Sequence, residues 1–228
     1  MNISHMPNLL SGKSGAVFAE LESRFAKGYY KFGERLSQAE LAEEFNVSLQ
    51  PMRAALGQLR AQGFIIITPQ VGCRVVSPSV AEISDFFLMF ARMEGVTASL
   101  AAERFDISQL TVLEQVFEQL IDCPMPQKGL AKDYAKLVRI WHHTVRQMAH
   151  SPSLDWRISS FWNMADFLLW QTAPLLGKTQ IEIANKQRDQ IMQAIRERDA
   201  KRSEELMFNH VFSKPSRVGI LPEESTNR

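Results

Sequence analysis

The feature that most constrains this chain is a pair of short helical patterns joined by a tight turn within residues 37–63. The first pattern begins at Ser37, which can cap a helix, and Glu40 follows three residues later to complete a capping box. Apolar residues then recur at helical spacing up to Asn46, a residue type that tolerates the left-handed conformation of a turn. The segment therefore predicts a helix-turn-helix.

The second helix of this pair is predicted to start at Ser48. Pro51 falls in its first turn, where a missing backbone N–H costs nothing, and Gly63 ends it. Its core-facing residues are spaced three and four apart. They are Met52, Ala55, Leu56 and Leu59.

A β-hairpin pattern follows the second helix. The apolar and β-branched residues 64–68 lead into turn chemistry, and residues 73–76 can return as the partner strand. Before the pair, residues 14–27 have the amphipathic spacing of a third helix. Together these elements predict a winged helix-turn-helix.

A winged helix-turn-helix places its second helix in the major groove of DNA, where the first residues of that helix reach base edges. Here those residues are Ser48, Leu49, Gln50 and Arg53. Arginine can pair with a guanine edge, and glutamine with an adenine. Further DNA contacts, mainly to phosphates, are expected from Lys31, Arg35, Ser37, Gln38, Gln70 and Arg74. The alternative for this domain is a winged helix used only for protein contacts.

At these residues the chain resembles the GntR family of bacterial transcription regulators. The matches follow the family pattern in order and without a gap. They are Gly28, Gly33, Leu36, Ser37, Leu41, Ala42, Val47, Ser48, Pro51, Arg53, Ala55, Leu56, Leu59 and Gly63. Leu49 stands where the family has Arg, and Ala54 stands where it usually has Glu. The operator consensus of the family therefore cannot be carried over.

With 228 residues and 45% hydrophobic residues, the chain is long enough for two domains with real cores. The formal net charge is only +1, and residues 1–78 carry eight Lys and Arg against six Glu. Such a mildly basic domain gains little non-specific DNA affinity from counterion release, so we expect a homodimer to be needed for useful binding.

The two cysteines, Cys73 and Cys123, imply no disulfide framework and fit a reducing cytoplasm. The first ten residues lack the pattern of a signal peptide, and no apolar stretch reaches 18 residues. We therefore expect a cytoplasmic protein without a membrane span.

From residue 80 onward the sequence reads as helices with short joints, so the predicted fold class is mainly α. The predicted helices are 81–105, 108–121, 132–150, 154–172, 179–198 and 200–212, with Ser108 as the cap of the second. The predicted domains are a winged helix-turn-helix at 11–77, an all-α effector-binding and dimerisation bundle at 80–213, and a polar tail at 214–228. Ser-Pro-Ser at 77–79 marks the boundary between the two domains.

The helical part is similar to the ligand-binding domain of the FadR branch of GntR regulators, the FCD type. The residues that carry this resemblance are Glu94-Gly95, Ala101-Ala102-Glu103-Arg104, Trp141-His142, Ala194-Ile195, Asp199, Met207 and His210. Many members hold a divalent metal there with one Asp and three His. The corresponding positions here are Val138, His142, Arg188 and His210. His142 and His210 alone make a weak metal site, so no cofactor and no metal are expected.

Arg188 suggests a different ligand chemistry. Its planar donor fork suits a carboxylate, so we expect a small organic acid or acyl effector held by Arg188, His142 and His210. Phe90 stands where the family usually has an Arg four residues before Glu94, and both Phe90 and Glu94 are expected among the effector-binding residues, together with Trp141. Aromatic walls are expected from Phe86, Phe90, Trp141, Trp162 and Trp170. The alternative is a buried ion pair of Arg188 with Glu94 or Asp166, and no ligand.

The sequence thus predicts a transcription regulator that binds double-stranded DNA at a palindromic operator as a homodimer. The family resemblance favours repression, and the residues leave activation open. One alternative is a degenerate regulator that acts as a protein-interaction module without small-molecule control. The other is a metal-dependent hydrolase built on His142 and His210. The sequence offers neither a carboxylate ligand beside these histidines nor a nucleophile elbow, so no enzyme activity is expected.

Overall fold

The computed structural model describes residues 10–70, 72–124, 132–172 and 177–217. The chain forms two compact units, each considered by itself below. The first comprises Met1–Ile83 together with Ser159–Thr172, and the second comprises Ser84–Ile158 together with Ala173–Arg228. The predicted domains placed residues 159–172 in the helical bundle, so the observed division differs from the prediction at this segment.

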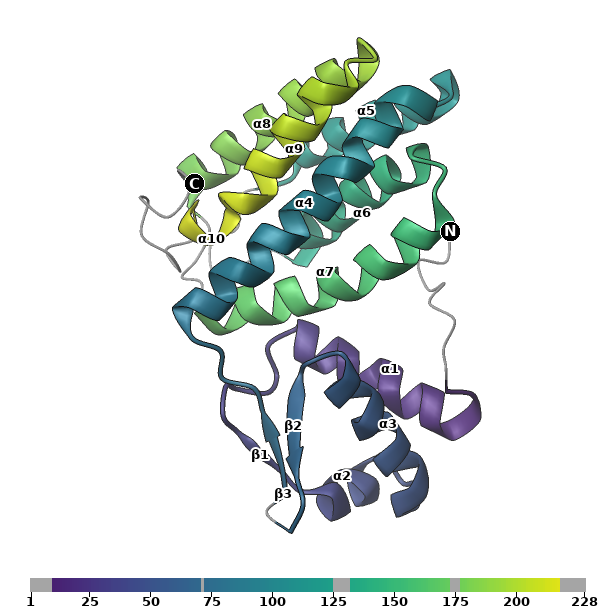
Figure 1. Ribbon diagram of the computed structural model, residues 1–228, viewed down its shortest axis with the longest axis vertical. Coiled ribbons are helices and arrows are strands. Elements are labelled where there is room, and N and C mark those ends of the chain that lie inside the picture. The colour runs from purple at the N-terminus through teal and green to yellow at the C-terminus, as the bar shows by residue number, and fades with distance from the viewer. Residues whose placement is uncertain (1–9, 71, 125–131, 173–176, 218–228) are drawn as a thin grey trace. The chain divides into compact units, whose positions relative to one another are not determined.

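The first unit contains a winged helix-turn-helix (Figure 1). Its elements are α1 (Gly12–Ala26), β1 (Arg35–Leu36), α2 (Gln38–Glu44), α3 (Leu49–Ala61), β2 (Ile65–Thr68) and β3 (Gly72–Val75). The three strands form an antiparallel sheet in the order β1-β3-β2, in which Ile67 pairs with Cys73 and Leu36 also pairs with Cys73 from the other side. The hairpin β2–β3 is the predicted wing.

Local signals set the ends of these helices as the sequence predicted. The Ser37 hydroxyl oxygen accepts a hydrogen bond from the backbone N–H of Glu40 at 3.3 Å, which caps α2. Asn46 has a φ of 49° and so turns the chain between α2 and α3. Gly63 has a φ of 84° just after α3, a conformation that other residues adopt only with strain.

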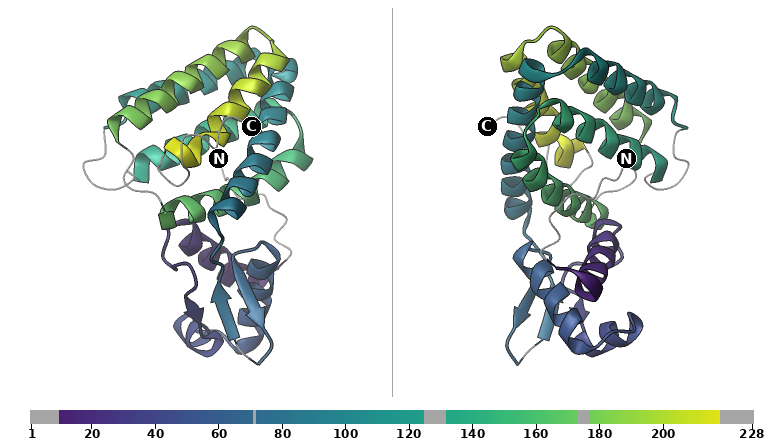
Figure 2. Two further views of the ribbon diagram at one scale, coloured as in Figure 1. Left: turned by 60° about the vertical axis from the view of Figure 1, so that its left-hand side comes forward. Right: turned by 90° about the vertical axis from the view of Figure 1, so that its right-hand side faces the viewer.

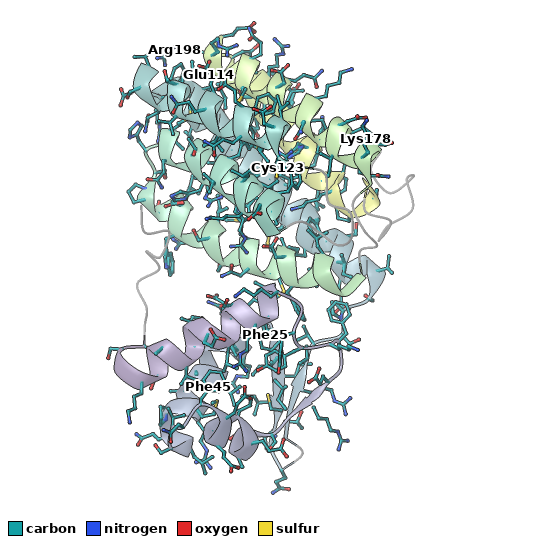
Figure 3. The ribbon with its side chains drawn as sticks, turned by 180° about the vertical axis from the view of Figure 1, so that it is seen from behind. Phe25, Phe45, Glu114, Cys123, Lys178 and Arg198 are labelled. Carbon is teal, nitrogen blue, oxygen red and sulfur yellow. The ribbon has the colours of Figure 1, made fainter. Side chains whose placement is uncertain are left out.

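The core of the first unit is aromatic and lies between α1, α3 and the sheet. Phe25 and Phe64 are fully buried, with ring centroids 5.2 Å apart (Phe25 is labelled in Figure 3). Phe167, from the 159–172 segment, completes this group at 5.4 Å from Phe25, 5.7 Å from Phe64 and 5.3 Å from Phe32. These contacts explain why residues 159–172 belong to the first unit.

The second unit is an all-α bundle (Figure 2). The helices that contribute to it are α4 (Val80–Arg104), α5 (Ile107–Asp122), α6 (Lys132–Met148), α7 (Pro152–Thr172), α8 (Lys178–Arg196), α9 (Ala200–Phe212) and α10 (Lys214–Arg217). Helix α8 packs along α9, and α5 packs along α6. Trp141, Phe87, Phe90 and Met207 are fully buried in this bundle.

One local prediction needs correction, and two short elements were not predicted. Asp106, not Ser108, is the N-cap of α5, and the Gln109 side-chain oxygen accepts a hydrogen bond from the Asp106 N–H at 3.0 Å. The two-residue strand β1 was not predicted, because it is too short to show an alternating pattern. Helix α10 lies within residues 214–228, where a polar tail was expected.

Among the described residues, no helix combines the length and the apolar character that crossing a membrane requires.

Candidate functional site

Helix α3 presents a polar edge at its N-terminal end. Ser48 is its N-cap, and Ser48, Gln50 and Arg53 are exposed, as is Leu49 at 43%. Within the described part of the chain, neither the Gln50 amide nor the Arg53 guanidinium has a hydrogen-bond partner. The opposite face of α3 is buried through Met52, Ala55, Leu56 and Leu59. The structure thus places the four predicted base-reading residues together on the outer side of one helix.

Cations of the wing region lie side by side. Arg35 of β1 and Arg74 of β3 are register partners in the sheet, and both side chains are exposed. The Arg74 guanidinium donates a hydrogen bond to the Gly33 carbonyl at 2.9 Å, which restrains it. Like charges directly opposite each other on paired strands repel, and an anion between them relieves that repulsion. This pair therefore fits the phosphate contacts predicted for Arg35 and Arg74.

The remaining predicted DNA contacts are more dispersed. Lys31 is exposed, and its backbone N–H donates to the Glu34 carboxylate at 2.8 Å. Gln70 is exposed with a φ of 63° in the turn of the wing. Ser37 and Gln38 are only partly exposed at the start of α2, and the Ser37 oxygen already serves as the helix cap.

The second unit contains a buried polar network around Glu94 of α4. The Glu94 carboxylate is fully buried, and its Oε2 lies 3.0 Å from His142 Nδ1. Its other oxygen accepts a hydrogen bond from Arg146 at 3.4 Å. Burial lowers the pKa of His142 to about 4, although the Glu94 carboxylate acts in the opposite direction. His142 is therefore neutral at pH 7, and it donates its Nδ1–H because the carboxylate can only accept.

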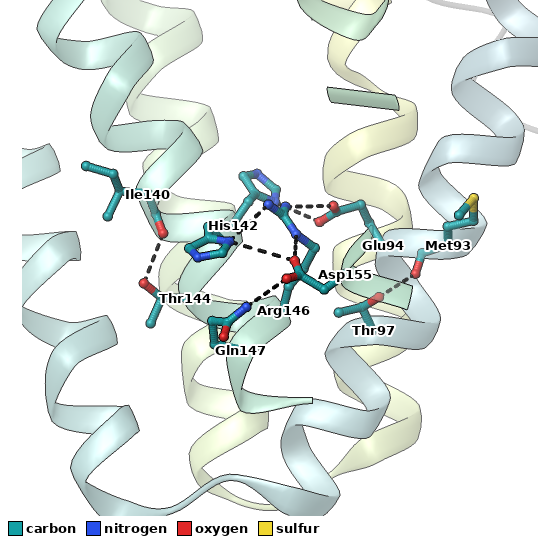
Figure 4. Close-up of polar contacts among 10 residues, drawn as sticks. Met93, Glu94, Thr97, Ile140, His142, Thr144, Arg146, Gln147 and Asp155 are labelled. Carbon is teal, nitrogen blue, oxygen red and sulfur yellow. Dashed lines mark hydrogen bonds and ion pairs between the residues drawn. The ribbon is translucent and has the colours of Figure 1, made fainter. Parts of the chain in front are cut away.

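The network continues from Arg146 to α7. Arg146 Nε donates to Asp155 Oδ1 at 3.0 Å, and Gln147 Nε2 donates to Asp155 Oδ2 at 2.9 Å (Figure 4). One buried guanidinium thus bridges Glu94 and Asp155 and joins α4, α6 and α7. Of these residues, the sequence prediction included Glu94 and His142 but neither Arg146 nor Asp155.

Arg188 of α8 is buried, and no carboxylate among the described residues forms an ion pair with it. Its Nη1 donates to the Tyr134 hydroxyl at 3.0 Å and to the Asn185 side-chain oxygen at 2.7 Å. The guanidinium carbon lies 5.9 Å from the ring centroids of both Tyr134 and Trp141. Arg188 is 4% exposed, and its Nε has no hydrogen-bond partner among the described residues. The Trp141 Nε1 is also buried without a partner there.

The predicted companions of Arg188 lie in the same bundle. His210 stacks on His142 with ring centroids 5.5 Å apart, and its Nδ1 lies 2.9 Å from the Gln187 side-chain oxygen. Trp141 meets His142 edge-on at 4.9 Å. Phe90 is fully buried, and its ring packs on Phe86 at 5.9 Å.

Two of the aromatic residues that were expected to line the effector pocket cannot be assigned to this group. Trp162 belongs to the first unit, and the side chain of Trp170 lies outside the described residues. The group around Arg188 is therefore built from α6, α8 and α9.

The residues at the position where many FCD-type relatives hold a metal do not fit a cation. The Nδ1 of His142 is engaged by Glu94, and the permanent charge of Arg188 repels a second positive charge. No group of three or more His, Cys, Asp or Glu among the described residues could hold a metal ion.

Comparison with known families decides the identity of both units. The model described as bacterial regulatory proteins of the gntR family matches residues 13–75, and the model of the FCD domain matches residues 85–213. The chain belongs to the GntR family, in its FCD branch. It is accordingly a DNA-binding transcription regulator, from a family of regulators rather than of enzymes.

Relatives of this GntR chain span nearly its full length. It is 28% identical over 199 residues to the HTH-type transcriptional repressor GlaR of Escherichia coli, covering 85% of this chain and 90% of that protein. It is 27% identical over 197 residues to the HTH-type transcriptional repressor RspR of Escherichia coli, covering 86% and 84%. The solved structure of E. coli McbR/YncC has the same fold, with a TM-score of 0.73 at 18% identity over 91% of this chain and 97% of that one.

Several residues of the buried groups around Glu94 and Arg188 in this GntR chain were not found from sequence. Tyr134 and Asn185 fix the Arg188 guanidinium, and Arg146 and Asp155 fix Glu94. A usable signal existed for Arg146, which follows His142 by four residues and so shares its helix face.

Proposed function

We propose that this GntR regulator is a homodimeric repressor that reads a palindromic operator through α3 and releases it in response to a small organic acid bound at Arg188. The names of GlaR and RspR, both repressors, support repression. The exposed edge of α3 supports the assignment of the reading helix.

The observation that carries the effector proposal is the incomplete hydrogen bonding of the Arg188 guanidinium. Its Nη1 is satisfied twice, by Tyr134 and Asn185, whereas Nε is buried without an acceptor among the described residues. An unsatisfied buried donor on a charged group is costly, so an acceptor is expected to complete it. The remaining Nε and Nη2 edge has the spacing that a carboxylate accepts with both oxygens.

Trp141 adds a second indication of the same chemistry. Its buried Nε1 is a donor without a partner in the described residues, and its ring lies 5.9 Å from the Arg188 guanidinium carbon. Both unsatisfied groups are donors, so the expected ligand is rich in acceptors. The rings of His142 and His210 give it an aromatic neighbourhood.

The structure weakens the alternative in which Arg188 is neutralised by its own chain. Glu94 is engaged by His142 and Arg146. No described carboxylate, Asp166 included, forms an ion pair with Arg188. The cation therefore lacks a counter-charge within the described chain, and an acidic ligand supplies one.

Coupling to DNA requires the acid to bind two arrangements of the protein with different affinity. The polar network offers a route, because His142, a neighbour of Trp141, is tied through Glu94 and Arg146 to Asp155 of α7. Residues 159–172 of the same helix belong to the first unit. We infer that occupancy at Arg188 acts on the DNA-binding unit through α7.

Dimerisation is supported by an exposed apolar strip on α4. Leu88, Met89 and Val96 are 40%, 49% and 42% exposed in the single chain. Met89 and Val96 are seven residues apart and so lie on one face of the helix. A second copy covering this strip would bury it and supply the second α3 that a palindrome requires.

The first test is selection of genomic DNA fragments by the purified protein at near-physiological salt. A short palindrome shared by the retained fragments is the expected result, and fragments without a common sequence would favour a protein-interaction module instead. The genes beside the palindrome then nominate acids for calorimetry.

Calorimetry compares the wild type with Arg188→Gln and with Arg202→Gln, whose exposed side chain pairs with Glu197. We expect one acid to bind the wild type and Arg202→Gln alike, to lose at least tenfold in affinity for Arg188→Gln, and to weaken operator binding. Equal affinity for Arg188→Gln would remove Arg188 as the anchor.

A further inference from the structure

Leu49 is an apolar side chain where polar ones are expected. It occupies the first position of α3 and is 43% exposed. Its neighbours on the same exposed edge, Ser48, Gln50 and Arg53, are all polar. Leu49 makes no contribution to the buried stripe of α3, so the fold of the first unit does not account for a leucine at this position.

The position of Leu49 relative to Arg53 defines a row along the helix. Four residues separate them, so their side chains lie on the same side of α3, about 40° apart around its axis. Gly57 continues the row four residues later, and a Cβ built there meets nothing within 4 Å. The row Leu49–Arg53–Gly57 is thus open to an approaching surface along its whole length.

The major groove of DNA offers one apolar group to such a side chain. Every base edge there presents hydrogen-bonding atoms, and only thymine adds a C5-methyl group. A leucine has no donor or acceptor, so the favourable contact that it can make with a base edge is with that methyl. We propose that Leu49 is a specificity-determining residue that selects a thymine in each operator half-site by packing on its C5-methyl group.

This inference rests on the proposed role of α3 as the reading helix and adds to it a predicted base. Arg53 and Leu49 lie one turn apart, so the selected thymine lies near the base that Arg53 contacts. Burying a methyl against a leucine side chain changes the binding constant by roughly three- to tenfold. That factor applies to each half-site separately.

The test uses the full chain and its selected operator, in which each thymine is replaced in turn by deoxyuridine. Deoxyuridine lacks only the methyl group, so hydrogen bonding and base pairing are kept. The expected result is one thymine per half-site whose replacement lowers wild-type affinity by roughly three- to tenfold. Leu49→Ala should bind the thymine and deoxyuridine operators equally.

Arg60→Gln is the matched control, because it alters an exposed side chain in the last turn of the same helix but keeps Leu49, and it should retain the sensitivity to deoxyuridine. Thermal melts of both variants check that α3 is intact. Specific binding without any methyl-sensitive thymine, or the same sensitivity in Leu49→Ala, overturns this inference and leaves the proposed function standing. Absence of sequence-specific binding by the wild type overturns both.

Discussion

Glu94 Oε2 and His142 Nδ1 lie 3.0 Å apart, and both side chains are almost completely buried. The imidazole nevertheless stays neutral, because burial lowers the pKa of His142 to about 4 against the opposing effect of the carboxylate. The positive charge beside Glu94 therefore comes from Arg146 and not from His142.

This pKa predicts acid sensitivity. The ordinary pKa of histidine is 6.5, so between pH 6.5 and about pH 4 the unfolded chain binds a proton that folded His142 does not. Stability should fall as pH falls through this window, by up to about 1.4 kcal/mol per pH unit from this residue. Denaturant unfolding of the wild type and His142→Gln at pH 4.5 to 7 measures it. The variant should show a shallower slope, and parallel curves would contradict the assignment.

Removing Arg146 is predicted to lower the free energy of unfolding strongly, because its guanidinium is buried between two carboxylates. It is 5% exposed and links Glu94 with Asp155. Arg146→Met removes this cation from the buried Glu94 carboxylate, which should cost about 3–5 kcal/mol of unfolding free energy. The double variant Glu94→Gln with Arg146→Met removes both charges and should recover part of that loss in the same unfolding experiment. No recovery would show that the two charges act independently.

Local sequence signals predicted the fold well because each helix carries its own start and stop. Ser37, Asn46 and Gly63 behave as predicted, and every predicted helix of the bundle begins and ends within two residues of the observed one. The sequence pattern of α7 does not show which unit the helix packs against. Its apolar residues are compatible with either unit, and only the packing of Phe167 on Phe25 and Phe64 places residues 159–172 in the first.

The buried groups around Glu94 and Arg188 were predicted in part, for a comparable reason. Arg188 was predicted as a site residue because it stands where many members of the family have a metal-binding histidine. The residues that position it, Tyr134 and Asn185, are polar residues on amphipathic helices, and such residues usually face solvent. The hydrogen bond from Arg188 to Tyr134 spans 54 residues and leaves no periodic signal in a sequence, whereas Asn185, three residues before Arg188 on the same helix, did offer a local signal.

Gly57 is predicted to trade stability for DNA binding. A Cβ at Gly57 meets nothing within 4 Å, so Gly57→Ala should raise unfolding free energy by about 0.5–1 kcal/mol through helix propensity alone. The same variant should bind the operator more weakly if the row from Leu49 faces DNA. Gly63→Ala is the contrasting control, since its φ of 84° makes any side chain strained and the variant less stable. Unchanged stability in Gly57→Ala would contradict this prediction, because it would mean that a contact not seen in the single chain opposes the added methyl group.

Gly95 of α4 should accept a side chain only at a cost in stability. A Cβ there would lie 3.0 Å from the backbone oxygen of Glu204 and 3.5 Å from Phe208 Cβ, both on α9. Because backbone cannot give way as a flexible side chain does, Gly95→Ala should cost about 1–3 kcal/mol in chemical unfolding. Gly57→Ala serves as the matched glycine with open space. Equal behaviour of the two variants would mean that α4 and α9 are packed less closely than described.

Phe167 is expected to stabilise the DNA-binding unit although it lies about a hundred residues after it in sequence. Its ring is buried against Phe25, Phe32 and Phe64, so Phe167→Ala should cost about 3–5 kcal/mol, the usual loss for a large aromatic core residue. The loss should appear in the first unit, and hydrogen exchange of α1 and β2 amides would report it. Phe105→Ala, in the second unit, should leave those amides protected. If Phe167→Ala also leaves them protected, residues 159–172 do not belong to the DNA-binding unit in solution. Any route from Arg188 to DNA would then have to avoid α7.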